Sequence, residues 1–241
     1  MSLLPIDPRF PRHSRLWERV EAAMPAGEVA HDQQHVRRVY GWCIRLSPEA
    51  GADADLAGAA GLVHDLVRVP KHLAARPLGG ELSAHAARGL LPDAGYSTSE
   101  VATIVDAVAT HSWSRGLSPR SPEGMVLQDA DRLDAIGVIG VLRNAAVACA
   151  MAAAEPIVDG RPRAFFHPTD PLGESGRSLE DRTWALDHWP QKLLKLRDGM
   201  HCPSARKEAT RRHDWMLRTL EELALELPMR DPTPDSVDRF G

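Results

Sequence analysis

The sequence predicts an all-α protein. Apolar residues recur at spacings of three and four along most of the 241 residues, and no segment shows the strict alternation typical of strands. Proline and glycine gather in a few segments between these periodic stretches, as expected for loops. With 43% hydrophobic and 26% charged residues, the chain has the composition of a globular protein. We expect one helical domain over residues 14–228 and a flexible tail over residues 229–241.

The first helix with a clear apolar stripe is expected after Asp32, because aspartate is a favoured N-cap residue. Its stripe runs from Val36 to Leu46. A second stripe runs from Leu56 to Val67, and we expect Pro70 to end that helix. The helix predicted over residues 122–154 is expected to be kinked at Gly137 or Gly140. The further predicted helices span residues 82–91, 101–112, 122–154, 180–198 and 203–227.

Charge argues against some classes of partner. The chain has 29 basic and 33 acidic residues, spread along its length, and a formal net charge of −4. This balance gives no electrostatic basis for binding a nucleic acid or a membrane surface. It remains compatible with a small anionic ligand.

The cysteines and the apolar segments indicate a cytoplasmic protein. Cys43, Cys149 and Cys202 are odd in number and form no CxxC pair, which argues against a disulfide framework and a thiolate zinc site. The N-terminus contains no apolar run of signal-peptide length. The most apolar stretch is interrupted by Arg143 and Asn144, which argues against a membrane span.

Five predicted helices each carry a histidine or a carboxylate on or beside the apolar stripe. Burying an ionisable side chain costs free energy unless it finds a partner. Neutral imidazoles and carboxylates together are the ligands that divalent transition metals bind. These residues therefore indicate a metal site in the interior, and they are His35, His64, His85, His111 and Asp131.

The doublet His64-Asp65 constrains such a site further. Adjacent residues on a helix point about a third of a turn apart. The two side chains can therefore bind one metal that lies between helices, or they can bridge two metals. Any single histidine is more often structural than a ligand, and we assign no functional role to His13, His72, His167, His201 and His213.

These residues carry a resemblance to a known family. His35, the doublet His64-Asp65 and Asp131 within "DADRLDAIG" resemble the H…HD…D signature of the HD-domain metal-dependent phosphohydrolase superfamily, which has an all-α fold. The resemblance covers about residues 28–145. The later segment "DPL…ALDHWPQKLLKL" is similar to the C-terminal extension of an uncharacterised bacterial subgroup of these hydrolases, here about residues 180–227.

The resemblance implies a role for each matching residue. His35, His64, Asp65 and Asp131 match the metal ligands of the family. Asp131 is preferred to Asp129 because it occupies the aspartate of the "ADxL" segment, and two residues that lie two apart on a helix are not expected both to face inward. Two further histidines match the extra ligands of members with two metals and are expected to hold a second metal or the substrate, and these are His85 and His111.

Other polar residues have two interpretations each. Asp129 and Asp134 either accept hydrogen bonds from the imidazole N–H groups or are solvated. Lys71 follows the doublet closely, as a lysine does in hydrolases of this kind, and it either holds a phosphate oxygen or is solvated. Weaker candidates for contact with the substrate are Arg68, His188 and Lys192.

The implied chemistry is hydrolysis of a phosphoester. A divalent ion held by two histidines and two carboxylates can lower the pKa of water and polarise a phosphoryl oxygen. We expect one or two ions per chain, chosen from Mn, Co, Mg, Ni, Zn and Fe, and a nucleotide or another small phosphorylated metabolite as the substrate. The chain contains no GxxxxGK[ST], GxSxG or HExxH motif, which argues against common rival classes.

Two other functions remain open from the sequence. One is an HD-fold di-iron oxygenase, since a few members with the same ligand types oxidise their substrate. The other is a metal-stabilised regulatory or binding module without turnover. With two metals, Asp65 has to bridge them; with one metal, His111 lies beside the open position and His85 has no special role. The C-terminal helices also offer a possible homodimer surface.

Overall fold

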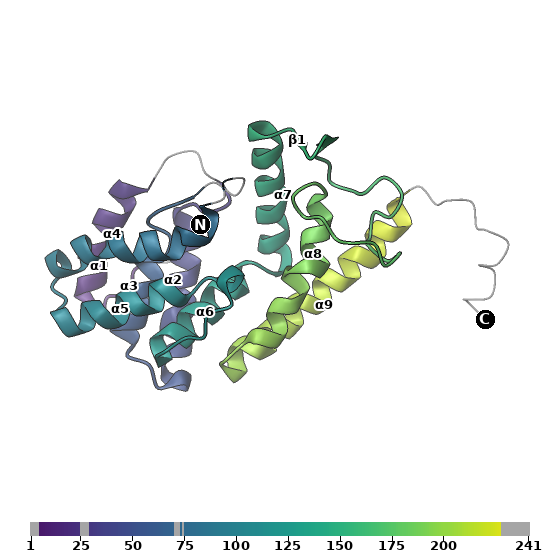
Figure 1. Ribbon diagram of the computed structural model, residues 1–241. Helices are drawn as coiled ribbons and strands as arrows, with labels where there is room; N and C mark the ends of the chain where they lie inside the picture. Colours follow the sequence, from purple (N-terminus) through teal and green to yellow (C-terminus); the bar gives the residue numbers. More distant parts are fainter. Residues whose placement is uncertain (1–4, 25–28, 70–72, 74, 228–241) are drawn as a thin grey trace.

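The computed structural model describes residues 5–24, 29–69, 73 and 75–227 and confirms the all-α prediction. A bundle of helices forms the N-terminal part, and a second group of helices packs on one side of it (Figure 1). The bundle consists of α1 (Pro11–Ala23), α2 (Gln33–Ala50), α3 (Ala54–Val63), α4 (Gly79–Ala94), α5 (Thr98–Thr110) and α6 (Pro122–Asp134). The second group consists of α7 (Gly137–Ala154), α8 (His188–Gln191) and α9 (Pro203–Glu226).

Short elements connect these helices. A small antiparallel hairpin follows α7 and contains β1 (Ile157–Val158) and β2 (Arg161–Pro162). The 3-10 turns are η1 (Arg76–Leu78), η2 (Trp113–Arg115), η3 (Ala185–Asp187) and η4 (Leu193–Gly199). Helix α7 contacts both α6 of the bundle and α9, and α9 also contacts α6 directly (Figure 1).

Most predicted helices are confirmed, with changed ends. Asp32 caps α2 by accepting a hydrogen bond of 2.8 Å from the backbone N–H of His35. Helix α3 ends at Val63, well before Pro70, so the predicted end was wrong. The reason lies in His64, whose Nδ1 contacts the carbonyl of Gly61 at 2.8 Å and thereby satisfies a carbonyl at the helix end.

The C-terminal half departs further from the prediction. The segment 122–154 is two helices rather than one kinked helix, because Gly137 has φ = +76° and starts α7 in a new direction. The segment 180–198 contains only short helical turns, whereas α9 is confirmed. Neither α1 nor the small hairpin was predicted from the sequence.

Small residues let α3 approach α2 very closely. A Cβ on Gly61 would lie 3.0 Å from Cys43 Sγ and 3.2 Å from Tyr40 Cα, and one on Gly58 would lie 2.8 Å from Ile44 Cδ1. Larger side chains at these positions would push the helices apart. The close approach therefore brings the start of α2 against the end of α3.

Asp129 joins the bundle to the C-terminal helices. It is fully buried, and its carboxylate accepts hydrogen bonds from the backbone N–H of His201 at 2.9 Å and of Cys202 at 2.7 Å. Both interpretations made from the sequence are therefore wrong, because Asp129 is buried and accepts no hydrogen bond from an imidazole of the described residues. The cause is that α6 is buried on nearly all sides, so Asp129 and Asp131 both point into the molecule in different directions.

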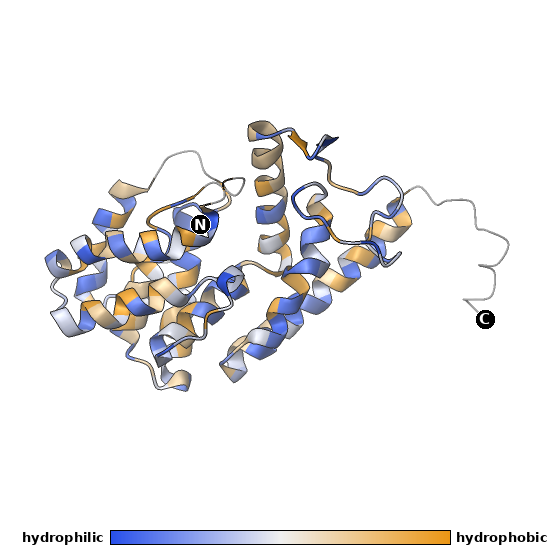
Figure 2. Ribbon diagram, viewed as in Figure 1, coloured by the Kyte–Doolittle hydropathy of each residue, from blue (hydrophilic) through white to orange (hydrophobic). Residues whose placement is uncertain are grey.

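Helix α7 is unusually apolar and exposed. Only Gly137 and Gly140 in it are buried, while Val138 and Leu142 are 51% and 66% exposed. Figure 2 shows apolar residues along most of its length. By length and composition it is the one helix in the described ranges that is able to cross a membrane, a property that core helices of soluble proteins share. Arg143 on this helix forms a 3.0 Å ion pair with Asp134, which ties α7 to the bundle.

We predict that Asp129→Ala lowers the free energy of unfolding by about 2–4 kcal/mol, because two buried backbone N–H groups lose a charged acceptor. Denaturant unfolding followed by circular dichroism measures this change. Asp198→Ala, at an exposed position near the same segment, is the control and should change stability by less than about 0.5 kcal/mol. Equal stability of the two variants would contradict the role of Asp129.

Candidate metal centre

Three elements bring His35, His64 and Asp131 to one point. His35 lies in the first turn of α2, His64 directly follows α3, and Asp131 lies in α6. The Nε2 atoms of His35 and His64 are 3.1 Å apart. Asp131 Oδ1 lies 3.8 Å from His35 Nε2 and 4.0 Å from His64 Nε2. These donor atoms are close enough together to hold one metal ion.

Asp65 completes this donor group. Its Oδ2 lies 3.5 Å from His35 Nε2 and 3.9 Å from His64 Nε2. The two imidazoles are buried, whereas the side chains of Asp65 and Asp131 are 23% and 28% exposed. The four sequence-predicted residues therefore lie together, with the carboxylates on the side open to solvent.

Each imidazole is oriented by an acceptor at its Nδ1. His35 Nδ1 lies 2.7 Å from Asp134 Oδ2, and His64 Nδ1 lies 2.8 Å from the carbonyl of Gly61. Although burial opposes ionisation, hydrogen bonds from His35 and Arg38 hold the pKa of Asp134 below its usual range. Carboxylate and carbonyl oxygens accept, so both Nδ1 atoms carry the proton.

This tautomer directs both Nε2 lone pairs at the same point. Two lone pairs 3.1 Å apart repel each other unless a proton or a cation lies between them. The donor set consists of imidazole nitrogens and carboxylate oxygens, which divalent transition metals accept. The arrangement therefore fits a divalent ion held by His35, His64, Asp65 and Asp131.

The pKa values of His64, Asp65 and Asp131 favour the forms that bind a metal, whereas that of His35 does not. Burial lowers the pKa of His64 to about 4, so its imidazole is neutral at pH 7. Burial lowers the pKa of His35 too, but hydrogen bonds to Asp134 and Asp65 outweigh it and raise the net value. Burial opposes ionisation of Asp65 and Asp131, yet the neighbouring histidines hold both pKa values below the usual range. Protons therefore compete with a metal mainly at His35.

His111 lies beside this donor group. It directly follows α5, is buried, and its ring centroid is 5.3 Å from that of His64. Its Nδ1 lies 2.7 Å from the carbonyl of Val108, and the side chain lines the cavity described below. This is the place that the one-metal interpretation gives to His111, next to the position that a substrate would occupy.

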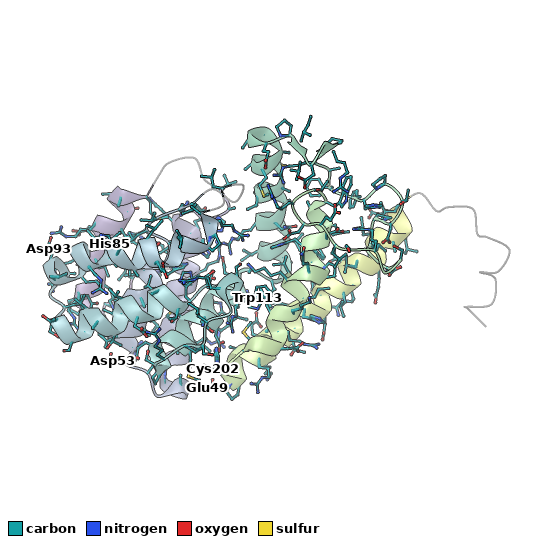
Figure 3. The ribbon with its side chains drawn as sticks, in the orientation of Figure 1. Glu49, Asp53, His85, Asp93, Trp113 and Cys202 are labelled. Carbon is teal, nitrogen blue, oxygen red and sulfur yellow. The ribbon has the colours of Figure 1, made fainter. Side chains whose placement is uncertain are left out.

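The structure does not bring His85 into the site, so the prediction that it holds a second metal or the substrate is wrong. Its side chain is exposed and does not line the cavity. In Figure 3 it lies with Asp93 on the side of the bundle that faces away from α7. The stripe assumed from Leu82 is itself on the outside, because Leu82 is 40% exposed. The face of α4 that is buried instead contains mainly small residues, namely Gly80, Ser83, Ala84, Ala87, Leu91 and Ala94.

One histidine that lies at the site was not predicted from the sequence. His31 precedes α2, lines the cavity, and has its ring centroid 5.6 Å from that of His35. Its charge helps to lower the pKa of Asp65. The signal that would have found it is its position directly before Asp32, the expected N-cap of the helix that contains His35.

The donor group opens into a cavity of about 390 Å³. Asp65 and Asp131 lie in its wall on the bundle side, and residues of α7 and α8 line the opposite side. Lys71, which was expected near the substrate, lies outside the described residues. The cavity is lined by four strongly basic side chains, which are Arg68, Arg76, Arg143 and Lys192.

Comparisons with known proteins agree with this fold. Residues 33–136 match the HD domain. The uncharacterized protein YpgQ of Bacillus subtilis (strain 168) is 29% identical over 219 residues, which cover 89% of this chain and 92% of YpgQ. The crystal structure of Bacillus subtilis YpgQ in complex with ADP has a TM-score of 0.65 at 26% identity and covers 91% of this chain and 100% of that one.

A second similar solved structure is that of a hydrolase. An HD-superfamily hydrolase from Bacillus thuringiensis has a TM-score of 0.63 at 26% identity, covering 89% of this chain and 96% of that chain. The match over residues 33–136 and this structural similarity support membership of the HD-domain superfamily. Its fold and its histidine and aspartate cluster support a metal-dependent hydrolase.

We predict that Asp131→Ala loses its metal, because the ion loses a charged ligand. Asp134→Asn should keep the fold but weaken metal binding about 10- to 100-fold, since the acceptor that orients His35 becomes neutral. Metal content after dialysis, measured by plasma mass spectrometry, reports both effects. His85→Ala is the control and should keep the wild-type metal content. Retention of metal in Asp131→Ala, or its loss in His85→Ala, would refute this assignment.

Proposed function

We propose that the protein is a cytoplasmic metal-dependent phosphohydrolase that cleaves a phosphoester of a nucleotide or another small phosphorylated metabolite. The observation that carries the proposal is the cavity, in which the donor group on one side faces basic side chains, among them Arg76, Arg143 and Lys192. This arrangement suits an anionic substrate whose phosphoryl group reaches the donor group. The crystal structure of YpgQ in complex with ADP adds support, because ADP is a phosphorylated nucleotide.

The residues around the donor group have distinct roles in this proposal. A divalent ion, when bound, supplies the activation of water and the polarisation of a phosphoryl oxygen. Asp134 and the Gly61 carbonyl fix the two imidazoles so that the donors need little rearrangement. His111, held through its Nδ1 by the carbonyl of Val108, presents its other nitrogen for proton transfer at the cavity wall.

The basic side chains that line the cavity stabilise a negatively charged substrate even where they form no hydrogen bond with it. Arg143 already donates to the carbonyl of Ala30 and to Asp134, so it acts on a substrate through its charge. Arg76 lines the same cavity, and burial lowers its pKa from a value so high that the guanidinium stays charged. Both side chains therefore favour a substrate with more than one negative charge.

The di-iron alternative is less well supported by this site. That interpretation needs six ligands, and it included His85, whose side chain is exposed and outside the cavity. The donors that lie together are sufficient for one ion, with His111 beside it. Hydrolysis through a single ion is the function that the arrangement favours.

A panel of phosphoesters tests the proposal. Protein loaded with Mn²⁺, Co²⁺ or Mg²⁺ should release phosphate or pyrophosphate from at least one nucleotide or small phosphorylated metabolite, and chelation should lower the rate by about 100-fold or more. Asp131→Asn should be inactive, and His85→Ala should have the wild-type rate. Turnover that requires iron and oxygen would favour the oxygenase. No turnover of any compound at full metal occupancy would favour a binding module.

A further inference from the structure

Lys192 lies in the C-terminal part of the chain and lines the cavity that holds the donor group. It directly follows α8, and its Nζ lies 5.7 Å from the centroid of the Trp113 ring. Figure 3 shows Trp113 between the bundle and α8. Counting only the ranges that the structure describes, this ammonium forms no hydrogen bond and no ion pair.

Several charged side chains from different parts of the chain influence the pKa of Lys192. Arg76 of η1 and Arg143 of α7 oppose its charge, whereas Asp131 of α6 and Asp181 favour it. Burial is the largest influence and, with Arg76, lowers the pKa of Lys192 to about 8. Asp181 is engaged elsewhere, because its Oδ2 lies 2.7 Å from His188 Nδ1. The ammonium is therefore mostly charged at pH 7 without a dedicated counter-ion.

We propose that Lys192 binds an anionic oxygen of the substrate directly, so that the C-terminal extension completes the binding site whose other side is the HD domain. Taking a charged ammonium out of water costs free energy unless an anion compensates it. An ammonium offers three donors, and no described residue accepts a hydrogen bond from Lys192. The identity of the anion as a phosphate rests on the proposed function, but anion binding itself does not require hydrolysis.

The neighbouring basic groups are less suited to this contact. Arg143 is already bonded to Asp134 and to the carbonyl of Ala30, and His188 is held by Asp181. Lys192 follows His188 by four residues, so the two side chains lie on one face and both line the cavity. The contact between Asp181 and His188 thus fixes both of these side chains, whereas the N–H groups of Lys192 can bond to a ligand.

Competitive acetylation tests the contact without any assay of turnover. The chain has four lysines, at positions 71, 192, 195 and 207, so mass spectrometry can follow each one. Acetic anhydride reacts with the neutral amine, and the lowered pKa should give Lys192 a half-maximal rate near pH 8. Millimolar inorganic pyrophosphate should slow acetylation of Lys192 by at least about fivefold and leave the exposed Lys195 unchanged. Equal acetylation of Lys192 with and without pyrophosphate would overturn the proposal.

Substitution gives a second readout. With any substrate found by the panel, Lys192→Met should raise KM by about 10- to 100-fold, because a charge-assisted hydrogen bond is lost, while metal content stays at the wild-type level. Lys192→Arg should recover part of the loss, and Lys195→Met is the matched control. A KM for Lys192→Met within about twofold of wild type would refute a direct contact.

The two proposals can fail separately. If pyrophosphate protects Lys192 but no phosphoester is hydrolysed, the proposed function is wrong and the anion site stands. If a phosphoester is hydrolysed and Lys192→Met behaves like Lys195→Met, the anion site is wrong and the proposed function stands.

Discussion

The carboxylate of Asp134, at the C-terminal end of α6, holds together the parts of the molecule that form the cavity. It accepts from His35 Nδ1 at 2.7 Å, from Arg38 at 2.6 Å and from Arg143 of α7 at 3.0 Å. A buried carboxylate is costly unless several donors surround it, and here each partner belongs to a feature that the site needs. The hydrogen bond from His35 fixes the tautomer of that imidazole, and the bond from Arg143 positions α7, which lines the opposite side of the cavity.

Much of the donor group could be predicted because helical periodicity relates each residue to its apolar neighbours. His35 lies one turn before Val39, and His64 one turn after Ala60, so both are directed to the interior if their helices are amphipathic. The structure does bring these side chains together with Asp65. The closeness of the contact was not predictable in the same way, because it depends on the small residues of α3 meeting α2.

The errors have physical causes that a local pattern does not contain. The buried face of α4 consists mostly of glycine, serine and alanine, which contribute little to an apolar pattern. The exposed Leu82 was therefore taken to mark the buried face, and His85 was assigned to that face incorrectly. Asp129 is covered by residues 201 and 202, whose backbone N–H groups bond to its carboxylate, and that contact spans more than seventy positions along the chain. Arg143 was considered only as a break in an apolar run, although a lone charge in such a run needs a partner, and Asp134 is that partner.

The cavity has two sides that derive from different stretches of the chain. The donor group belongs to residues 35–131, within the segment that matches the HD domain, whereas α7, α8 and the start of η4 line the side across from it. Gly137 marks the change of direction between them. In evolutionary terms, substitutions in the later segment can reshape the space that a ligand occupies while the metal donors stay the same. Relatives with this architecture can therefore diverge in the molecules they accept without rebuilding their reactive centre.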